Sequence, residues 1–461
     1  MYANWKLECG DPLRSLVWPP RIRVGINGYG PIARNFIRCA IESDRGVDVV
    51  AINAPGISPE LLLYLIKYNS VYSPCPGVVK SKATFERPFR PDAPHCLMLD
   101  ICGRSIAYYD CENPADIPWH WMDVEYVLEA SEHLVKLEDA EKHLSGGRAR
   151  KVVVIGDTVD IPIIFYPISY RKYQRGCSII SAGSADALAL ATLLHLLEKE
   201  FGIIEGMATL LTGFSSNQRI VDGPSRNGWR LGRGAAQSII PYNLERVLHT
   251  IMQSMPDMAG KILITGCSVP VDSSSAIDFT CRLYRPVASA RELADILRES
   301  NTLKTLEAIH MKCQPGWLLS HWCPEIPELK KSDLPKVQCT VNPNTTYRSN
   351  VQGIPELLGE EEVCFAAKRG TKTSDITTLE PLLQKPVELA ANVVHFWQNE
   401  DDCCVGRDIL SSGCMLTLDV HSSLSISDGS LIKLIAWYDR DMSFCKRILD
   451  LLVYMRYVDH S

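Results

Sequence analysis

A glycine-containing turn near residue 30 places the strongest constraint on what this chain can fold into. The run "RIRVGINGYGPIARNFIRCAIES" (21–43) begins with alternating apolar residues, passes through glycines and continues with apolar residues at helical spacing. Gly28, Gly30 and Ala33 match the G-x-G-x-x-G/A fingerprint between a strand and a helix. Because the apolar run "VDVVAIN" (47–53) follows, the pattern predicts a parallel β-α-β unit.

The physical use of such a turn is to let a pyrophosphate approach bare backbone at a helix N-terminus, where unpaired N–H groups favour negative charge. We therefore predict dinucleotide contact, and the alternative is that the glycines serve only the turn. Two features weaken cofactor binding: Pro31 has no N–H to donate, and Asn53-Ala54-Pro55 stands where a carboxylate normally holds the ribose hydroxyls. The residues predicted to contact the dinucleotide are Asn27, Gly28, Tyr29, Gly30, Pro31 and Ile32.

Charge and composition exclude several classes of partner. The 461 residues carry a formal net charge of -6, so the chain lacks the basic field that nucleic-acid binding requires. No apolar run reaches the length of a signal peptide or a membrane span. We expect a cytoplasmic protein with no nucleic-acid partner and no membrane association, in which the 17 cysteines remain thiols.

Two clusters of potential metal ligands lie in the second half of the chain. Cys313, His321 and Cys323 form the first cluster, and Cys403 with Cys404 forms the second. Neither has the paired C-x-x-C spacing that is typical of a zinc site. We therefore predict that the chain has no metal site.

Six motifs, taken together, resemble one known family. They are "RVGINGYGPIAR", "VVAINAP", "VEYVLEA", "FGIIEG", "VDGPSRNGWRLGRGAAQSIIP" and "LIKLIAWYD". In this order and spacing the chain resembles the phosphorylating glyceraldehyde-3-phosphate dehydrogenases over roughly residues 22–310 and 405–459. The resemblance implies a Rossmann NAD-binding domain and an α+β catalytic domain with a long loop. It also implies an enzyme that oxidises an aldehyde through a cysteine thioester, reduces NAD and transfers the acyl group to phosphate.

The resemblance suggests where the domains begin and end. Residues 1–20 would be an N-terminal extension, and residues 21–182 with 439–461 would form the Rossmann domain. Residues 183–438 would form the catalytic-type domain, and residues 312–404 would be an insertion foreign to the family. The fold class is therefore expected to be α/β, with a Rossmann domain, a second α+β domain and a large insertion.

The catalytic positions that the resemblance implies carry the wrong side chains. Aligned without a gap from "IIS" to "FGIIEG", the family's nucleophilic cysteine corresponds to Ala185, and its general-base histidine corresponds to Thr212. Cys177 lies before the strand rather than on the turn, and His195 is flanked by leucines, so we interpret both as bystanders. Ser184 and Asp186 suit a helix start through capping and the helix dipole.

Positions for substrate and cofactor are changed as well. By the resemblance, Ser268 replaces the family's phosphate-binding arginine, and Arg440 replaces the asparagine that binds the nicotinamide carboxamide. Ala54, after the second strand, replaces a further family contact to the cofactor. The negative charges of Asp186 and Glu245 would disfavour a dianionic substrate. The other changed positions are Glu112, Ala130, Ser131, Glu132, Ser215, Asn217, Asn243, Leu244 and Phe444.

These substitutions affect the chemistry and spare the scaffold. We therefore interpret the chain as a catalytically inactive family member that acts as a scaffold or interaction protein, with NAD binding weak or lost. The first alternative is an enzyme, either an NAD-dependent glycolytic dehydrogenase or a related aldehyde oxidoreductase with a rearranged site. The second is a nucleotide-binding regulator without chemistry.

Two segments suggest partners. In the family, the loop at Val221–Pro241 packs at a subunit interface, so the resemblance implies a homotetramer or at least a dimer. The 312–404 insertion contains His395, Phe396 and Trp397, which would either anchor a protein partner or pack the insertion onto its host.

Overall fold

A computed structural model describes most of the chain outside the N-terminus and the long insertion. It covers residues 21–43, 45–72, 75, 77–80, 82–86, 94–131, 136–214, 218–225, 228–271, 274–312, 393–398, 405–410 and 412–460. Within this part, two sheets of eight and seven strands form the framework. The predicted extension 1–20 and most of the 312–404 insertion lie outside the described residues.

The N-terminal sheet contains the predicted β-α-β unit. Its centre is parallel, and the strands from β5 through β2, β1, β6 and β7 to β8 pair in that order. Two antiparallel strands, β4 and β3, extend the β5 edge. The strands are β1 (Ile22–Asn27), β2 (Val47–Asn53), β3 (Thr84–Glu86), β4 (Cys96–Ile101), β5 (Arg104–Tyr109), β6 (Tyr126–Glu129), β7 (Lys151–Ile155) and β8 (Ile179–Gly183).

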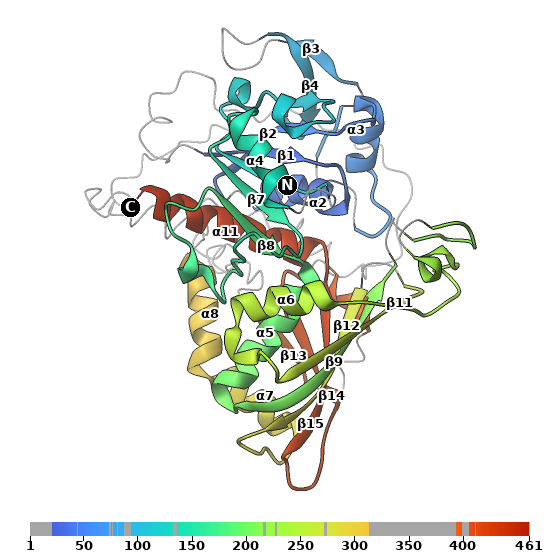
Figure 1. Cartoon of the computed structure of the whole chain (residues 1–461), viewed down its shortest axis with the longest axis vertical. Helices are drawn as coiled ribbons and strands as arrows, with labels where there is room; N and C mark the ends of the chain where they lie inside the picture. The colour runs from blue at the N-terminus through green and yellow to red at the C-terminus, as the bar shows by residue number, and fades with distance from the viewer. Residues whose placement is uncertain are drawn as a thin grey trace, which may run out of the picture. The chain divides into compact units, whose positions relative to one another are not determined.

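In the described part of the chain, four helices accompany this sheet. The first of them, α2, buries Ala33, Phe36 and Ile37, which are the residues at helical spacing in the sequence. The C-terminal helix α11, red in Figure 1, packs against α2 and β1 although it follows the second sheet. These helices are α2 (Pro31–Glu42), α3 (Pro59–Lys67), α4 (Leu137–Ser145) and α11 (Met442–His460).

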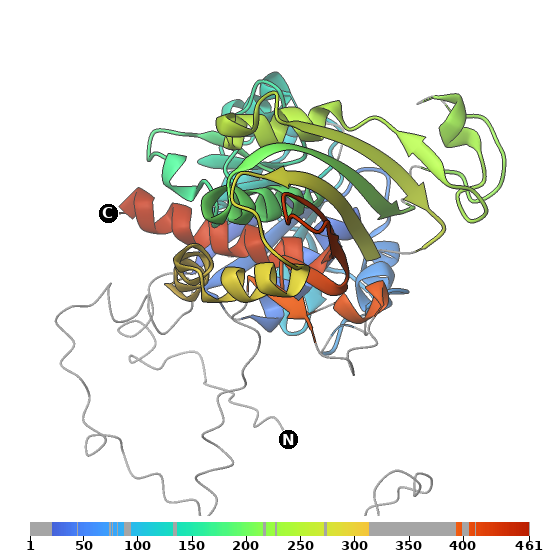
Figure 2. The same cartoon turned by 90° about the horizontal axis from the view of Figure 1, so that it is seen from below.

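The second sheet is mixed and has the strand order β10-β11-β9-β12-β15-β14-β13. Helices α5 and α7 pack on its strands β9 and β14. In Figure 2 the curved green and yellow strands of this sheet run side by side. The elements are α5 (Ala185–Glu200), β9 (Ile203–Gly213), β10 (Ile240–Tyr242), α6 (Glu245–Ser254), β11 (Ile262–Val269), β12 (Ser274–Leu283), α7 (Ala290–Glu299), α8 (Asn301–Lys312), β13 (Val394–Trp397), β14 (Leu416–Ser425) and β15 (Leu431–Asp439). Short 3₁₀ helices lie at Pro114–Asp116, Trp119–Met122, Tyr170–Lys172, Trp229–Gly232, Pro256–Met258 and Gly406–Ile409.

The aromatic segment of the insertion is part of this sheet. Its residues form β13, which pairs in parallel with β14. Trp397 is buried and lies beside Trp437, with ring centroids 6.4 Å apart. Phe396 lies under the guanidinium of Arg298. For Phe396 and Trp397 the structure therefore favours packing onto the host over an exposed anchor.

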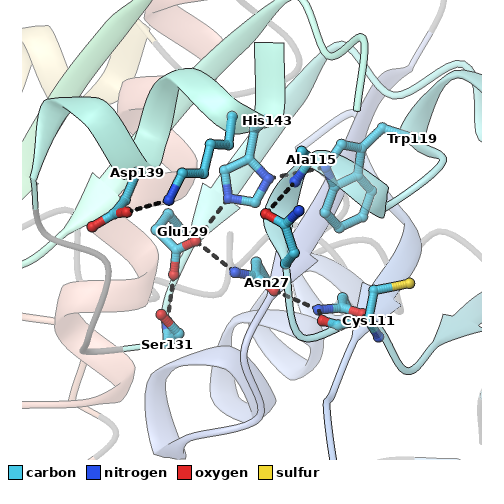
Figure 3. A network of polar contacts seen from close by, with 11 residues as sticks. Asn27, Cys111, Ala115, Trp119, Glu129, Ser131, Asp139 and His143 are labelled. Atoms are coloured by element: carbon cyan, nitrogen blue, oxygen red, sulfur yellow. Dashed lines mark hydrogen bonds and ion pairs between the residues drawn. The ribbon is translucent and has the colours of Figure 1, made fainter. Parts of the chain in front are cut away.

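A buried polar network joins the carboxyl ends of β1 and β6 (Figure 3). The Glu129 carboxylate accepts hydrogen bonds from the Asn27 amide at 2.6 Å and from the Ser131 backbone N–H at 2.8 Å. The Trp119 indole N–H donates to His143 Nδ1 at 3.1 Å. The remaining ring nitrogen, Nε2, therefore carries the proton and donates to Glu129 at 2.8 Å.

The same network reaches β2 and the loop after β5. The Asn53 amide donates to Asn27 Oδ1 at 2.7 Å and to the Cys111 carbonyl at 2.9 Å. The Cys111 backbone N–H donates in turn to Asn53 Oδ1 at 2.9 Å. Because each of these groups is satisfied, the network fixes three strand ends around the glycine turn.

Replacing Glu129 with Gln should destabilise the protein. Both carboxylate oxygens of Glu129 accept hydrogen bonds, and the NH₂ group of Gln would face a donor in place of one of these oxygens. Hydrogen bonds to a buried charged group contribute about 1.5–3 kcal/mol, so we expect a loss of about 2 kcal/mol in the free energy of unfolding. Urea denaturation measures it. Asp139→Asn is the matched control, because the half-exposed Asp139–Lys142 pair should contribute well under 1 kcal/mol. Equal midpoints for Glu129→Gln and wild type would contradict the prediction.

Candidate functional site

The glycine turn has the conformation that the fingerprint predicts. Gly28 has φ +116°, and a Cβ there would lie 2.5 Å from the Ala130 carbonyl oxygen, so only glycine fits. Gly30 is the N-cap of α2 and provides no side-chain cap, and Pro31 occupies the first turn. The backbone N–H groups at this helix start therefore remain suited to an anion such as a pyrophosphate.

The rest of the dinucleotide site is less complete. Ala54 is fully buried after β2, so a methyl group stands where a ribose-binding carboxylate would be. Asn27 is engaged with Glu129 through its amide group and with Asn53 through its carbonyl oxygen. Tyr29 is exposed, and its carbonyl accepts a hydrogen bond from Arg34 at 2.7 Å. The residues present fit a pyrophosphate better than they fit an adenosine ribose.

Helix α5 begins at the segment that the resemblance assigns to catalysis. Ser184 is its N-cap, and the Ser184 hydroxyl accepts a hydrogen bond from the Ala187 backbone N–H at 3.2 Å. The capping prediction for Ser184 is therefore confirmed. Ala185 is the first helical residue, and Asp186 follows it in the first turn.

An ion pair occupies the space between this helix start and the end of β15. Arg440 Nε lies 3.2 Å from Asp186 Oδ1, and the Tyr438 hydroxyl donates to the same oxygen at 2.9 Å. Arg440 also donates to the Gly213 carbonyl at 3.2 Å. The Asp186 carboxylate raises the pKa of Arg440 above its ordinary value. The negative charge expected from Asp186 is thus balanced within the chain, which the sequence interpretation did not include.

Two further positions lie side by side on neighbouring strands. Thr212 on β9 and Ser268 on β11 are register partners, and both are buried. The Thr212 and Tyr242 hydroxyls are 2.9 Å apart, and the Ser268 hydroxyl donates to Gln218 Oε1 at 2.9 Å. Burial raises the pKa of Tyr242 to about 12, so this phenol remains protonated at neutral pH. Neither pair contains a group that acts as a base near pH 7.

Asp157 is a residue that sequence reasoning missed. It follows β7 at the carboxyl edge of the parallel sheet, a location where ligand sites concentrate, and this signal could have identified it. Its Oδ1 is buried and has no hydrogen-bond partner within the described part of the chain. Burial raises the pKa of Asp157 to about 6, and the nearby Asp186 adds to the shift.

Two cavities border these residues. One has a volume of about 660 Å³ and is lined in part by Thr212, Gln218, Arg230 and Ser268. The other has a volume of about 550 Å³ and is lined in part by Asp157, Ser184, Glu245 and Arg246. No described cysteine lines either cavity. Four residues line both cavities: Asp186, Tyr242, Asn243 and Arg440.

The remaining predicted residues lie away from the two cavities or outside the described part. His195 lies on α5 and lines neither cavity, and burial lowers its pKa. Cys177 precedes β8. The described residues contain no group of three or more potential metal ligands and no helix long and apolar enough to span a membrane. The positions outside the described residues are Glu132, Ser215, Asn217, Cys313, His321, Cys323, Cys403 and Cys404.

Comparison with known proteins agrees with this architecture. Residues 22–136 match the family model "Glyceraldehyde 3-phosphate dehydrogenase, NAD binding domain", and residues 184–314 match the model of the C-terminal domain. The first range contains the glycine turn, and the second begins at the N-cap of α5.

Individual relatives extend the match. Over 280 residues the chain is 32% identical to a glyceraldehyde-3-phosphate dehydrogenase of Podospora anserina. This alignment covers 61% of this chain and 78% of the relative. It is 34% identical over 268 residues to the testis-specific protein of Rattus norvegicus, at 58% of each chain. A relative from Echinococcus multilocularis is 26% identical over 438 residues, covering 95% of this chain and 99% of the relative. The chain therefore belongs to the glyceraldehyde-3-phosphate dehydrogenase family.

Proposed function

We propose that this chain is a catalytically inactive member of its family, acting as a scaffold or interaction protein with weak or absent NAD binding. The observation that carries the proposal is Ala185 at the start of α5, the position assigned to the nucleophile. A methyl group cannot form the thioester on which the family's chemistry depends. No cysteine within the described residues lines the neighbouring cavities, which argues against a relocated nucleophile.

The hydrogen bonds around the cavities support the same proposal. Thr212, at the general-base position, shares its hydroxyl with Tyr242. Ser268, at the position of the phosphate-binding arginine, donates to Gln218. The Glu245 N–H, near the start of α6, is taken by Asn243 Oδ1 at 2.7 Å. The three positions that the resemblance links to base and phosphate contacts are therefore neutral or already paired within the chain, although the cationic side chains of Arg230 and Arg246 also line the cavities.

The alternative is an NAD-dependent dehydrogenase or aldehyde oxidoreductase with a rearranged site. The intact glycine turn and the names of the relatives, which are glyceraldehyde-3-phosphate dehydrogenases, favour it. The Asp186–Arg440 pair counts against it, because Arg440 replaces the expected carboxamide partner and is held by Asp186 and Gly213. Binding of a nucleotide without turnover would leave the proposal of inactivity intact.

The activity assay separates the two functions. Because loss of a covalent nucleophile costs on the order of 10⁶ in turnover, the purified chain should show no NADH production above background with glyceraldehyde 3-phosphate, phosphate and NAD. NADH absorbance measures the rate, and an active relative assayed in parallel is the control. Turnover at ordinary enzyme rates would overturn the proposal. If alkylation of the thiols abolished that turnover, and if bound substrate prevented this loss, a cysteine elsewhere in the chain would be the nucleophile.

We also propose that the chain forms a homo-oligomer in the cytoplasm and that the 312–404 insertion offers a surface to a protein partner. The loop between β9 and β10 projects from the second sheet (Figures 1 and 2), and Trp229 on it is 95% exposed. On the sheet, Met207 of β9 and Leu263 of β11 are exposed register partners. Two such exposed apolar areas support self-association.

Light scattering should therefore give the mass of a dimer or tetramer for the full chain. Leu263→Lys should lower that mass or weaken association by about tenfold, because it places a charge in the proposed contact. The matched control is Leu424→Lys, since Leu424 on β14 is 63% exposed and Leu263 is 65% exposed. A monomeric wild-type chain, or equal masses for both variants, would count against the proposed oligomer.

The Asp157 carboxyl provides a test of the cavity through stability. Its pKa is raised from 3.8 to about 6, so ionisation in the native state costs stability as pH rises through this window. Asp157→Asn removes this cost, so the variant should be more stable than wild type at pH 7.5. Its gain in the free energy of unfolding over wild type should be larger at pH 7.5 than at pH 4, by on the order of 2 kcal/mol.

Thermal and urea unfolding at the two pH values measure this difference. Asp222→Asn is the control, because the Gly234 N–H and Arg233 lower the pKa of that exposed carboxyl. Because the ionised Asp222 carboxylate favours the folded state, Asp222→Asn should lower the free energy of unfolding slightly at pH 7.5 relative to pH 4, which is opposite to the effect of Asp157→Asn. A pH-independent effect of Asp157→Asn would contradict the assignment of a buried, titrating carboxyl.

A further inference from the structure

Two thiols meet at the outer part of the N-terminal sheet, away from both cavities. Cys75 follows α3, and Cys102 lies in the turn between β4 and β5. Their Sγ atoms are 3.6 Å apart, which is van der Waals contact, and the two residues are not joined by a disulfide. Cys75 is buried, whereas Cys102 is partly exposed.

Backbone contacts hold the two segments together. The Cys102 N–H donates to the Val78 carbonyl at 2.8 Å, and Val79 forms an isolated antiparallel bridge with Ile101. A Cβ at Gly77 would lie 2.8 Å from Cys102 Sγ, so the absence of a side chain there makes room for the thiol. The paired backbone therefore brings the two cysteine residues close together.

The environment distinguishes the roles of the two sulfur atoms. Burial, followed by the contact with Cys102, raises the pKa of the Cys75 thiol to about 12, so Cys75 remains protonated at neutral pH. An oxidant dissolved in water reaches the partly exposed Cys102 first. Cys75 is then already within contact distance of the oxidised sulfur, and this proximity compensates for its low thiolate fraction.

We propose that Cys75 and Cys102 are a site of oxidative modification, at which a small hydroperoxide such as hydrogen peroxide converts the two thiols into a reversible disulfide. The Cys102 thiol gives up its proton, its sulfur attacks the peroxide and the O–O bond breaks; a sulfenic acid forms, and the departing hydroxide takes up a proton to become one water. Cys75 sulfur then attacks the sulfenic sulfur, the S–O bond breaks, and its oxygen leaves with the Cys75 proton as a second water. Two thiols are oxidised by two electrons, and one peroxide is reduced to two waters.

The disulfide would fix the segment after α3 to the β4–β5 turn. Three residues before Cys75, the Tyr72 hydroxyl donates to Asp439 Oδ1 at 2.6 Å. The same carboxylate oxygen accepts the backbone N–H groups of Asp441 and Met442 at the start of α11. Oxidation would therefore restrain the segment that holds the start of the C-terminal helix, and it should raise the thermal midpoint of the oxidised chain.

A second set of cysteines provides an internal control. Cys39 on α2 and Cys445 on α11 are both buried where these helices pack. Their thiols contact each other, and Cys39 also contacts the Met442 carbonyl and sulfur at 3.8 Å, while Cys445 contacts the Ile32 carbonyl at 3.5 Å. This set therefore differs from Cys75 and Cys102 in that both of its thiols are buried and closed to an oxidant dissolved in water. Burial raises the pKa of Cys445 well above its ordinary value. Peroxide should leave this set reduced in the folded chain.

The experiment exposes the full-length chain to hydrogen peroxide, blocks the remaining thiols and maps disulfide-linked peptides by mass spectrometry. The expected result is a peptide pair containing Cys75 and Cys102 that has lost two hydrogen atoms and is released by dithiothreitol. Cys102→Ser should abolish the linked pair, and Cys39→Ser should leave its yield unchanged.

Three results would overturn the proposal: Cys102 oxidised to a sulfinic acid without a link, a link between chains on a non-reducing gel, or Cys39 linked to Cys445 instead. Wild-type protein carries the primary measurement, so a variant that failed to fold would not remove the test. The thermal midpoint before and after oxidation is a second readout, and an unchanged or lower midpoint would contradict the proposed restraint.

Discussion

The ion pair between Asp186 and Arg440 is the interaction on which the candidate site depends. It joins the first turn of α5 to the end of β15, and through the Gly213 carbonyl it also holds the end of β9. A charge in such a position is tolerated because its partner lies 3.2 Å away and the Tyr438 hydroxyl provides a further hydrogen bond. Both cavities are bordered by this pair.

The surrounding polar groups show the same internal pairing. Thr212 contacts Tyr242, Ser268 donates to Gln218, and Asn243 accepts the N–H of Glu245. A ligand entering the cavities would have to replace hydrogen bonds that already exist, and the net gain from such an exchange is small. The glycine turn differs, because the start of α2 has no side-chain cap. The start of α2 therefore keeps backbone N–H groups that suit an anion.

Local features were predictable from the sequence, and distant pairings were not. The conformation of Gly28, the apolar face of α2 and the cap by Ser184 follow from spacing within a few residues. The pairing of Arg440 with Asp186 depends on two strands bringing together segments about 250 residues apart, as the 252-residue separation of Tyr438 and Asp186 illustrates. The Glu129–His143 contact is likewise a product of the sheet, and neither residue type indicates its partner in advance.

This coupling explains why the substitutions at the site must be considered together. If Arg440 alone were the asparagine that the family resemblance implies, the buried Asp186 would lose the cation that balances it, and an unpaired buried charge is costly. If Asp186 alone were neutral, Arg440 would keep only the Gly213 carbonyl and would be released toward the cavities. Each residue makes the other tolerable. Asp186 and Arg440 are therefore better considered as one unit than as two separate substitutions.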